Sequence, residues 1–195
     1  MNIDKRLNIV LKVEGDDGSV MHVHSTPILA SVYETNWRLI TKTAVDLYGD
    51  GLGIAAAARV AMLALRDTAR TMDGPDWERN KTFQTMADAL LNEIWRQTTV
   101  VIPGERGWDT VAFYDVVRDK LIDGEQLSEV KNALTFFTLA SWFHRASERK
   151  EANEILKHYG ALIVSSTAME FASSLPTSTA VVSTGEKATP LSIPV

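Results

Sequence analysis

Two histidines, His22 and His24, are the residues whose type and spacing come closest to a metal site. They stand two positions apart in a stretch that alternates in polarity, so both imidazoles project from the same face of a β-strand. Two ring nitrogens at that spacing can reach one metal ion. No carboxylate lies at a recognisable spacing to complete the ligand set. We therefore favour a strand face packed on the rest of the fold, and expect no metal or cofactor.

Two glycine-rich stretches have the spacing of ligand-binding loops. Residues 49–53 look like a phosphate-binding loop, but that fingerprint needs a preceding strand, and here a helical pattern precedes it. We interpret this stretch as a helix C-cap followed by a turn. Residues 104–107 have the GxxG spacing of one RNA-binding module. They follow a β-branched run in an acidic protein, however, which favours a tight loop with Trp108 as a buried anchor.

Groups that could perform catalysis are present, but their contexts do not suit it. The acidic pairs, Asp16 with Asp17 and Asp73 with Asp76, fall in polar turns, where we expect solvated caps rather than a tuned acid–base pair. No serine lies in a nucleophile elbow such as GxSxG. The chain has no cysteine, which excludes a thiol nucleophile, thiolate zinc sites, iron–sulfur clusters and disulfides. The sequence therefore predicts a protein that is not an enzyme.

The 195-residue chain carries 20 basic and 25 acidic side chains, for a net charge of −5. The mean field of such a surface repels nucleic acid and anionic membranes, so neither is an expected partner. The most apolar stretch, residues 53–65, contains Arg59 and is far shorter than the roughly 20 residues that span a bilayer. The first 14 residues lack the apolar region of a signal peptide. By default we expect a cytoplasmic protein that is not secreted.

Local patterns predict a mainly α fold of five to seven helices with a small N-terminal antiparallel β-hairpin. Residues 7–14 and 20–24 alternate in polarity around a glycine-rich turn, which is typical of a hairpin. Ser25 and Thr26 are expected to cap the first helix, with Pro27 in its first turn. Residues 98–102 are expected to be extended. Helices are expected at about residues 27–48, 52–72, 76–95, 110–121, 127–145, 152–159 and 167–172.

The sequence indicates one globular domain, residues 1–172, with the hairpin in residues 1–24 and the helices in residues 25–172. Beyond it the composition changes: 12 of the last 23 residues are serine, threonine or proline, and no aromatic residue remains. Such a segment cannot bury enough apolar surface to offset the entropy lost in ordering it. Residues 173–195 are therefore predicted to be a flexible tail unless a partner holds them.

The helix expected at residues 127–145 is the most apolar one. Aromatic side chains cover much of its circumference, which is typical of a buried helix, so we favour a central core helix. A contact surface for another copy of the chain or for a client protein is the alternative. The expected core consists of Trp37, Leu63, Leu90, Ile94, Trp95, Phe113, Leu134, Phe137, Leu139 and Trp142.

Several blocks of the sequence together resemble a group of tailed-bacteriophage proteins encoded among the tail genes, similar to tail assembly chaperones. These blocks are residues 23–28 (VHSTPI), 91–94 (LNEI), 103–108 (PGERGW), 129–134 (EVKNAL), 136–141 (FFTLAS), 174–179 (SLPTST) and 192–194 (SIP). The candidate protein-interaction residues are Phe136, Trp142 and Phe143 of the aromatic helix, together with Arg106, Trp108, Leu175 and Pro176.

The resemblance implies a helper of tail morphogenesis that acts in the host cytoplasm during infection. Such chaperones bind the tape measure protein and deliver tail-tube subunits to it, and in many phages a programmed frameshift appends a further domain. The family has no catalytic motif to carry over. The alternative is a structural virion subunit, tail or capsid-associated, whose C-terminal tail is ordered by neighbouring subunits. Formation of a homo-oligomer is compatible with either role.

Overall fold

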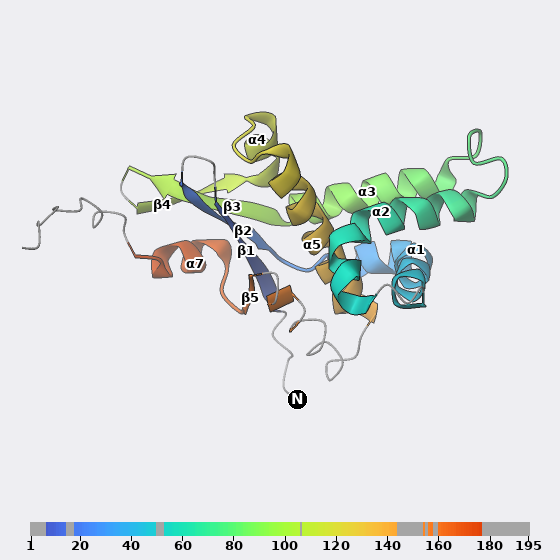
Figure 1. Cartoon of the computed structure of the whole chain (residues 1–195), viewed down its shortest axis with the longest axis horizontal. Helices are drawn as coiled ribbons and strands as arrows, with labels where there is room; N and C mark the ends of the chain where they lie inside the picture. The colour runs from blue at the N-terminus through green and yellow to red at the C-terminus, as the bar shows by residue number, and fades with distance from the viewer. Residues whose placement is uncertain are drawn as a thin grey trace, which may run out of the picture.

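The computed structural model describes residues 7–14, 18–49, 53–105, 107–143, 154, 156–157 and 160–176. In this part of the chain a five-stranded antiparallel sheet stands beside a group of helices (Figure 1). The N-terminal hairpin and a large helical part are confirmed. The expected mainly α class is wrong, however, because the hairpin is the centre of a larger sheet and the fold is mixed α and β.

The sheet has the strand order β4-β3-β2-β1-β5. Strand β1 pairs with β2 on one side and with the distant β5 on the other, while β3 joins β2 to β4. Residues 98–102, expected to be extended, lie in β3. The strands are β1 Asn8–Glu14, β2 Val20–Ser25, β3 Thr98–Gly104, β4 Gly107–Ala112 and β5 Ala161–Val164.

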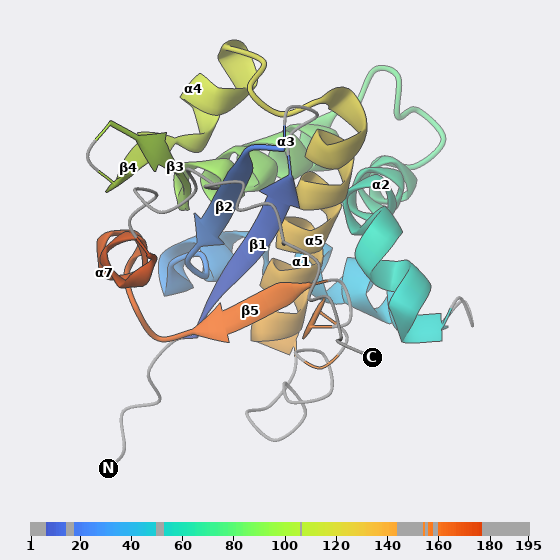
Figure 2. The ribbon, with the colours of Figure 1, turned by 60° about the vertical axis from the view of Figure 1, so that its left-hand side comes forward.

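The helices lie on both faces of the sheet, but very unequally. Helices α1 to α5 all supply side chains to the main core on one face, and among the described helices the short α7 alone covers part of the other (Figures 1 and 2). We call these the inner face and the outer face. The helices are α1 Ala30–Gly49, α2 Gly53–Asp73, α3 Thr82–Arg96, α4 Phe113–Arg118, α5 Gly124–Phe143 and α7 Ala168–Ser174.

Alternation along β1 divides its side chains between two clusters. Ile9, Leu11 and Val13 belong to the main core on the inner face, whereas Val10 belongs to a small cluster under α7. The same rule applies to β3, where Val100 lies in the main core and Val101 in the outer cluster. Since successive strand residues point to opposite faces, one continuous sheet supplies both clusters.

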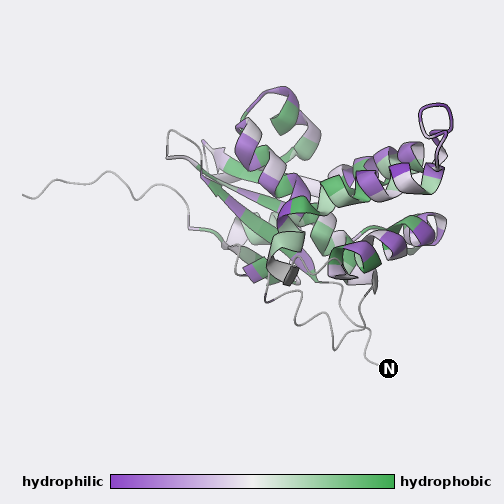
Figure 3. Cartoon of the chain, turned by 45° about the vertical axis from the view of Figure 1, so that its right-hand side comes forward, coloured by the Kyte–Doolittle hydropathy of each residue, from purple (hydrophilic) through white to green (hydrophobic). Residues whose placement is uncertain are grey.

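Helix α5 is the innermost helix. Every residue from 132 to 140 is buried, because α5 contacts β1 as well as α1 and α2 (Figure 2). The favoured interpretation of this segment as a central core helix is confirmed. The helices at the right of Figure 3 instead carry hydrophilic and hydrophobic residues in alternation, as amphipathic surface helices do. Among the described residues, no helix has the length and apolarity needed to cross a membrane.

The two edge strands were missed by the local patterns. Residues 110–112 were expected to open a helix, but they complete β4, where Thr110 pairs with Val101 and Val111 with Val100. Helix α4 begins only at Phe113. Strand β5 has four residues, too few for a period to be recognised, and it forms because β1 offers an edge to pair with.

The start of α1 also differs from expectation. Ser25 was expected to cap this helix, but it is the last residue of β2 and pairs with Ile9 and Thr98. The backbone N–H of Thr26 donates to the carbonyl oxygen of Gln97 at 3.1 Å, so the chain is still bound to its neighbour at that point. Helix α1 therefore begins later, at Ala30.

The α2–α3 turn is closed by a buried carboxylate. Asp73 was expected to be a solvated cap, but it is buried and accepts the backbone N–H groups of Phe83 and Gln84 at 2.8 and 3.1 Å. It thereby satisfies the start of α3, whose own N-cap residue, Lys81, makes no side-chain cap hydrogen bond. Burial alone would raise the pKa of Asp73, but these hydrogen bonds outweigh it and lower the pKa below its usual value.

Replacing this carboxylate should loosen the α2–α3 turn. We expect Asp73→Ala to lower the melting temperature by several degrees, and Asp76→Ala, at a nearby exposed position, to leave it nearly unchanged. Because the folded pKa of Asp73 is lowered, its contribution is present above about pH 4 and is lost as the pH falls further. Thermal unfolding of the wild type and both variants between neutral pH and about pH 3 measures both effects. Equal melting temperatures for the two variants would contradict the assignment.

Most of the expected core is buried, with two corrections. The side chains of Trp37 and Leu63 are 53% and 57% exposed. Each has the helical spacing of a core residue, but α1 and α2 lie at the surface and turn these positions away from the sheet. Trp142 is half-buried against the core. The remaining expected core residues are buried: Leu90, Ile94, Trp95, Phe113, Leu134, Phe137 and Leu139.

The contrast between buried and exposed aromatic residues can be measured. Phe136 is 1% exposed, so Phe136→Ala should cost about 3–5 kcal/mol through the cavity it leaves. Trp37→Ala, although it removes a larger side chain, should change the free energy of unfolding by only about 0.5 kcal/mol. Urea unfolding of both variants measures these free energies. Similar losses of stability in the two variants would show that Trp37 is packed against the core.

Helix α7 ends at Ser174, and the structure describes the chain as far as Pro176. Residues 177–195, most of the expected tail, lie outside the described residues. The helix expected at residues 152–159 also falls largely outside them. Within it, Leu156 is described and belongs to the main core.

Candidate interaction surfaces

The outer face of the sheet brings together three of the candidate contact residues, Trp108, Leu175 and Pro176. The indole Nε1–H of Trp108 on β4 donates to the carbonyl oxygen of Pro176 at 2.9 Å, just beyond the end of α7. We call the side chains gathered here the outer cluster. It consists of Val10, Val101, Trp108, Val164, Phe171, Ala172 and Leu175.

His22 and His24 lie on this same outer face, as their spacing predicts. The ring Nε2 of His24 lies 2.9 Å from the carbonyl oxygen of Ser166 and donates to it, and Asn8 Nδ2 donates to the same oxygen at 2.8 Å. His22 contacts two aromatic rings instead of a polar group. In the part of the chain that the structure describes, no group of three or more histidine or acidic residues could hold a metal ion.

The aromatic residues of α5 have different environments. Phe136 is fully buried and offers no surface to a partner. Trp142 is half-buried and stacks on Tyr33 of α1, with ring centroids 4.5 Å apart and an angle of 8° between the planes. Arg106 and the side chain of Phe143 lie outside the described part of the structure.

An exposed apolar ridge runs along the start of α1. Sequence patterns placed Trp37 of this ridge in the core and did not single out its other residues. Leu29, Tyr33 and Trp37 follow one another at intervals of four residues, and the backbone N–H of Tyr33 already bonds to the carbonyl oxygen of Leu29. Leu29 and Trp37 are each 53% exposed, while Tyr33 rests on Trp142. We call these three residues the α1 ridge. Rows of side chains at this spacing are the ridges that fit into grooves on a second helix.

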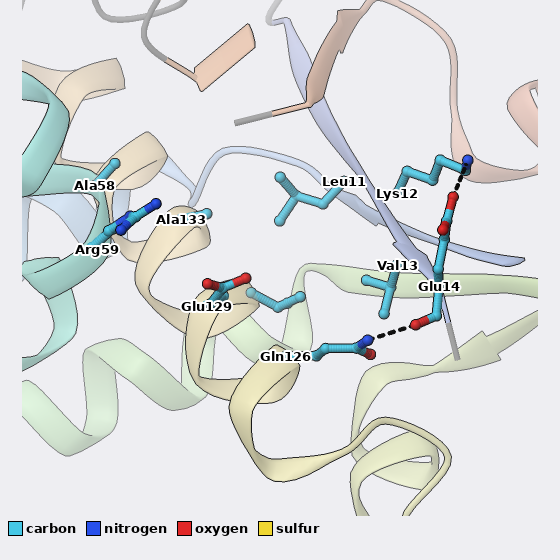
Figure 4. A pocket seen from close by; sticks show the side chains of 10 residues that line it. Leu11, Lys12, Val13, Glu14, Ala58, Arg59, Gln126, Glu129 and Ala133 are labelled. Carbon is cyan, nitrogen blue, oxygen red and sulfur yellow. Dashed lines mark hydrogen bonds and ion pairs between the residues drawn. The ribbon is translucent and has the colours of Figure 1, made fainter. Parts of the chain in front are cut away.

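A pocket opens between β1, α2 and α5 (Figure 4). Its volume is about 200 Å³, and Leu11, Val13 and Val130 supply part of its apolar lining. Beside it, Gln126 Nε2 donates to the backbone carbonyl oxygen of Glu14, as the dashed line in Figure 4 marks. Sites for drug-sized ligands measure roughly 300–1,000 Å³, so the size of this pocket gives no reason to assign it a ligand.

A second, more open pocket lies between α2 and α3, beside the exposed Leu63. Three of its four charged side chains, those of Arg66, Arg70 and Asp88, have partners. Arg66 lies 3.6 Å from the carboxylate of Asp88, and the Arg70 guanidinium stacks over the Trp77 ring at 3.8 Å. These contacts are typical of a solvated helix surface and indicate no bound anion.

The comparisons with known proteins add no relative. No protein-family model matches the sequence, no curated protein is similar to it, and no solved structure matches the fold.

The stack between Tyr33 and Trp142 should couple the middle residue of the α1 ridge to α5. In a double-mutant cycle with Tyr33→Ala and Trp142→Ala, we expect a coupling energy of about 0.5–1.5 kcal/mol, because each ring loses its partner in either single variant. The free energies of unfolding of the two single variants and the double variant measure it. Strictly additive losses would show that the rings do not stabilise each other.

Proposed function

We propose that this protein is a non-enzymatic tail assembly chaperone of a tailed bacteriophage that binds helices of the tape measure protein through the α1 ridge. It would act in the host cytoplasm during infection. Tail-tube subunits are the second partner that the resemblance implies. The observation that carries the proposal is the ridge itself, because the side chains of Leu29 and Trp37 in it are each 53% exposed to solvent. Isolated exposed apolar residues are ordinary, but a row of them beside a stacked aromatic pair is typical of a contact surface.

The kind of partner follows from the spacing of the ridge. Side chains four residues apart on one helix interdigitate with the same rows on another helix. A long amphipathic helix with an unpaired apolar face is therefore a suitable client, and the tape measure protein of the family that this sequence resembles has long helices. Trp37 would be the anchor, since large aromatic residues dominate the energetics of such contacts.

The composition of the purified phage particle tests the role. We expect the protein to be abundant in the infected lysate and absent from finished particles, because a chaperone leaves when assembly ends. Quantitative mass spectrometry of both samples measures this. Stoichiometric presence in the particle would overturn the proposal and favour the structural virion subunit instead.

The surface is tested by co-purification with the tape measure protein of the same phage. Trp37→Ser should reduce the bound tape measure protein at least tenfold, which corresponds to about 1.4 kcal/mol. Leu121→Ser is the matched control, because Leu121 is a similarly exposed apolar residue, 47% exposed, outside the ridge. Undiminished binding by Trp37→Ser would place the contact elsewhere on the chain.

A further inference from the structure

We propose that α7 is an acid-released cover of the sheet: protonation of the His22 imidazole frees α7 from the outer face and exposes Trp108. This inference does not depend on the proposed function. It rests on how lightly α7 is attached, on the place of His22 beneath it, and on the charges around that ring.

Helix α7 is attached by few contacts. Of its seven residues only Phe171 and Ala172 are buried, and its N-terminus is satisfied internally by a capping box between Thr167 and Glu170. The hydrogen bonds that join this segment to the described strands lie at its two ends. Ser166 accepts from Asn8 and His24 before the helix, and Pro176 accepts from Trp108 after it. Elements that bury so little surface open far below the free energy of global unfolding.

His22 lies at the centre of this contact. Its ring meets Trp108 at 5.5 Å and Phe171 at 5.3 Å between centroids, in both cases edge to face. Its Nδ1 is buried and has no hydrogen-bond partner among the residues that the structure describes. A neutral imidazole suits this half-buried, apolar setting, whereas a charged one would leave its buried Nδ1–H without an acceptor among the described residues.

The charges around the ring oppose a cation. Lys12 lies directly opposite on β1 and its charge acts on the ring, while its own ion pair is with Glu14. On the other side β3 and β4 bring Val101, Thr110 and Trp108, none of them charged. From α7, the one carboxylate, Glu170, bonds to the N-cap residue Thr167. Burial, and then the charge of Lys12, lower the pKa of His22 below its usual value.

His24 is the other imidazole on this face, and its side chain is 2% exposed. The Nε2 of His24 donates to the carbonyl oxygen of Ser166. His22 differs from it because its buried Nδ1 has no hydrogen-bond partner among the residues that the structure describes.

The direction of the pH dependence follows from this lowered pKa. When α7 lifts, the burial of the His22 ring is relieved and its pKa rises toward the usual value of about 6.5, although Lys12 on β1 still opposes the charge. The closed form is thus fully favoured above about pH 6.5 and loses stability as the pH falls from there toward the lowered value. Within that interval the population of the open form rises by at most about tenfold per pH unit, because a single proton is taken up.

The full-length protein labelled with 5-fluorotryptophan provides the test. The five tryptophans give separate fluorine resonances, and Trp108→Phe assigns the one of interest. Trp108 is only half-buried in the closed form. Between about pH 7.5 and pH 5, the solvent isotope shift of its resonance should increase, while that of Trp95, buried in the main core, stays constant. A Trp108 resonance that does not respond, or a Trp95 resonance that changes with it, overturns the proposal.

Two variants separate the role of His22 from general acid loosening. His22→Gln should abolish the response of Trp108, since glutamine does not titrate. Lys12→Gln, at an exposed position, should move the midpoint to higher pH, because it removes a positive charge that opposes protonation. An unaltered response in His22→Gln, or an unmoved midpoint in Lys12→Gln, would show that another group controls the cover.

Discussion

Pairing of β1 along both of its edges is the constraint on which the rest of this structure depends. β1 joins the N-terminal hairpin to β5 near the other end of the described chain. Its alternating side chains supply the main core on one face and the outer cluster on the other. If its register slipped by one residue, Val10 would face α5 and Ile9 would face α7. The position of α5, the attachment of α7 and the two unequal faces all follow from this strand.

The inner and outer faces of the sheet are covered by very different numbers of helical residues, and this decides which side chains a partner can reach. The inner face is buried under α5 and the helices around it, so the aromatic residues there stabilise the fold and are not available to partners. Surfaces open to partners lie at the edges of this layer. The α1 ridge is one of them, because α1 contacts the other helices with one side and leaves Trp37 on its free side. The cover over the outer face is small enough to be displaced.

Sequence patterns predicted those helices and strands whose own residues repeat in polarity over a long stretch. The hairpin, α2, α3 and the buried α5 follow from polarity periods of several residues, and their existence did not require knowledge of the fold. The fold class was wrong because the edge strands β4 and β5 carry weak or short patterns. Local propensity also made Ser25 a cap of α1, where pairing of β2 with β1 and β3 continues the strand instead. In each case tertiary pairing outweighed a local preference.

The candidate surfaces show the same division. The sequence by itself determined that His22 and His24 share a strand face and that no cysteine chemistry is possible, and it favoured a central α5, because these depend only on residue type and period. Only the tertiary structure decided which apolar residues are exposed. Helical spacing made Trp37 and Leu63 look like core residues, since a period shows that a helix has an apolar side but not whether a neighbour covers it. It also decided that Trp108 meets Pro176, because residues so far apart in sequence meet only once the strands between them have paired.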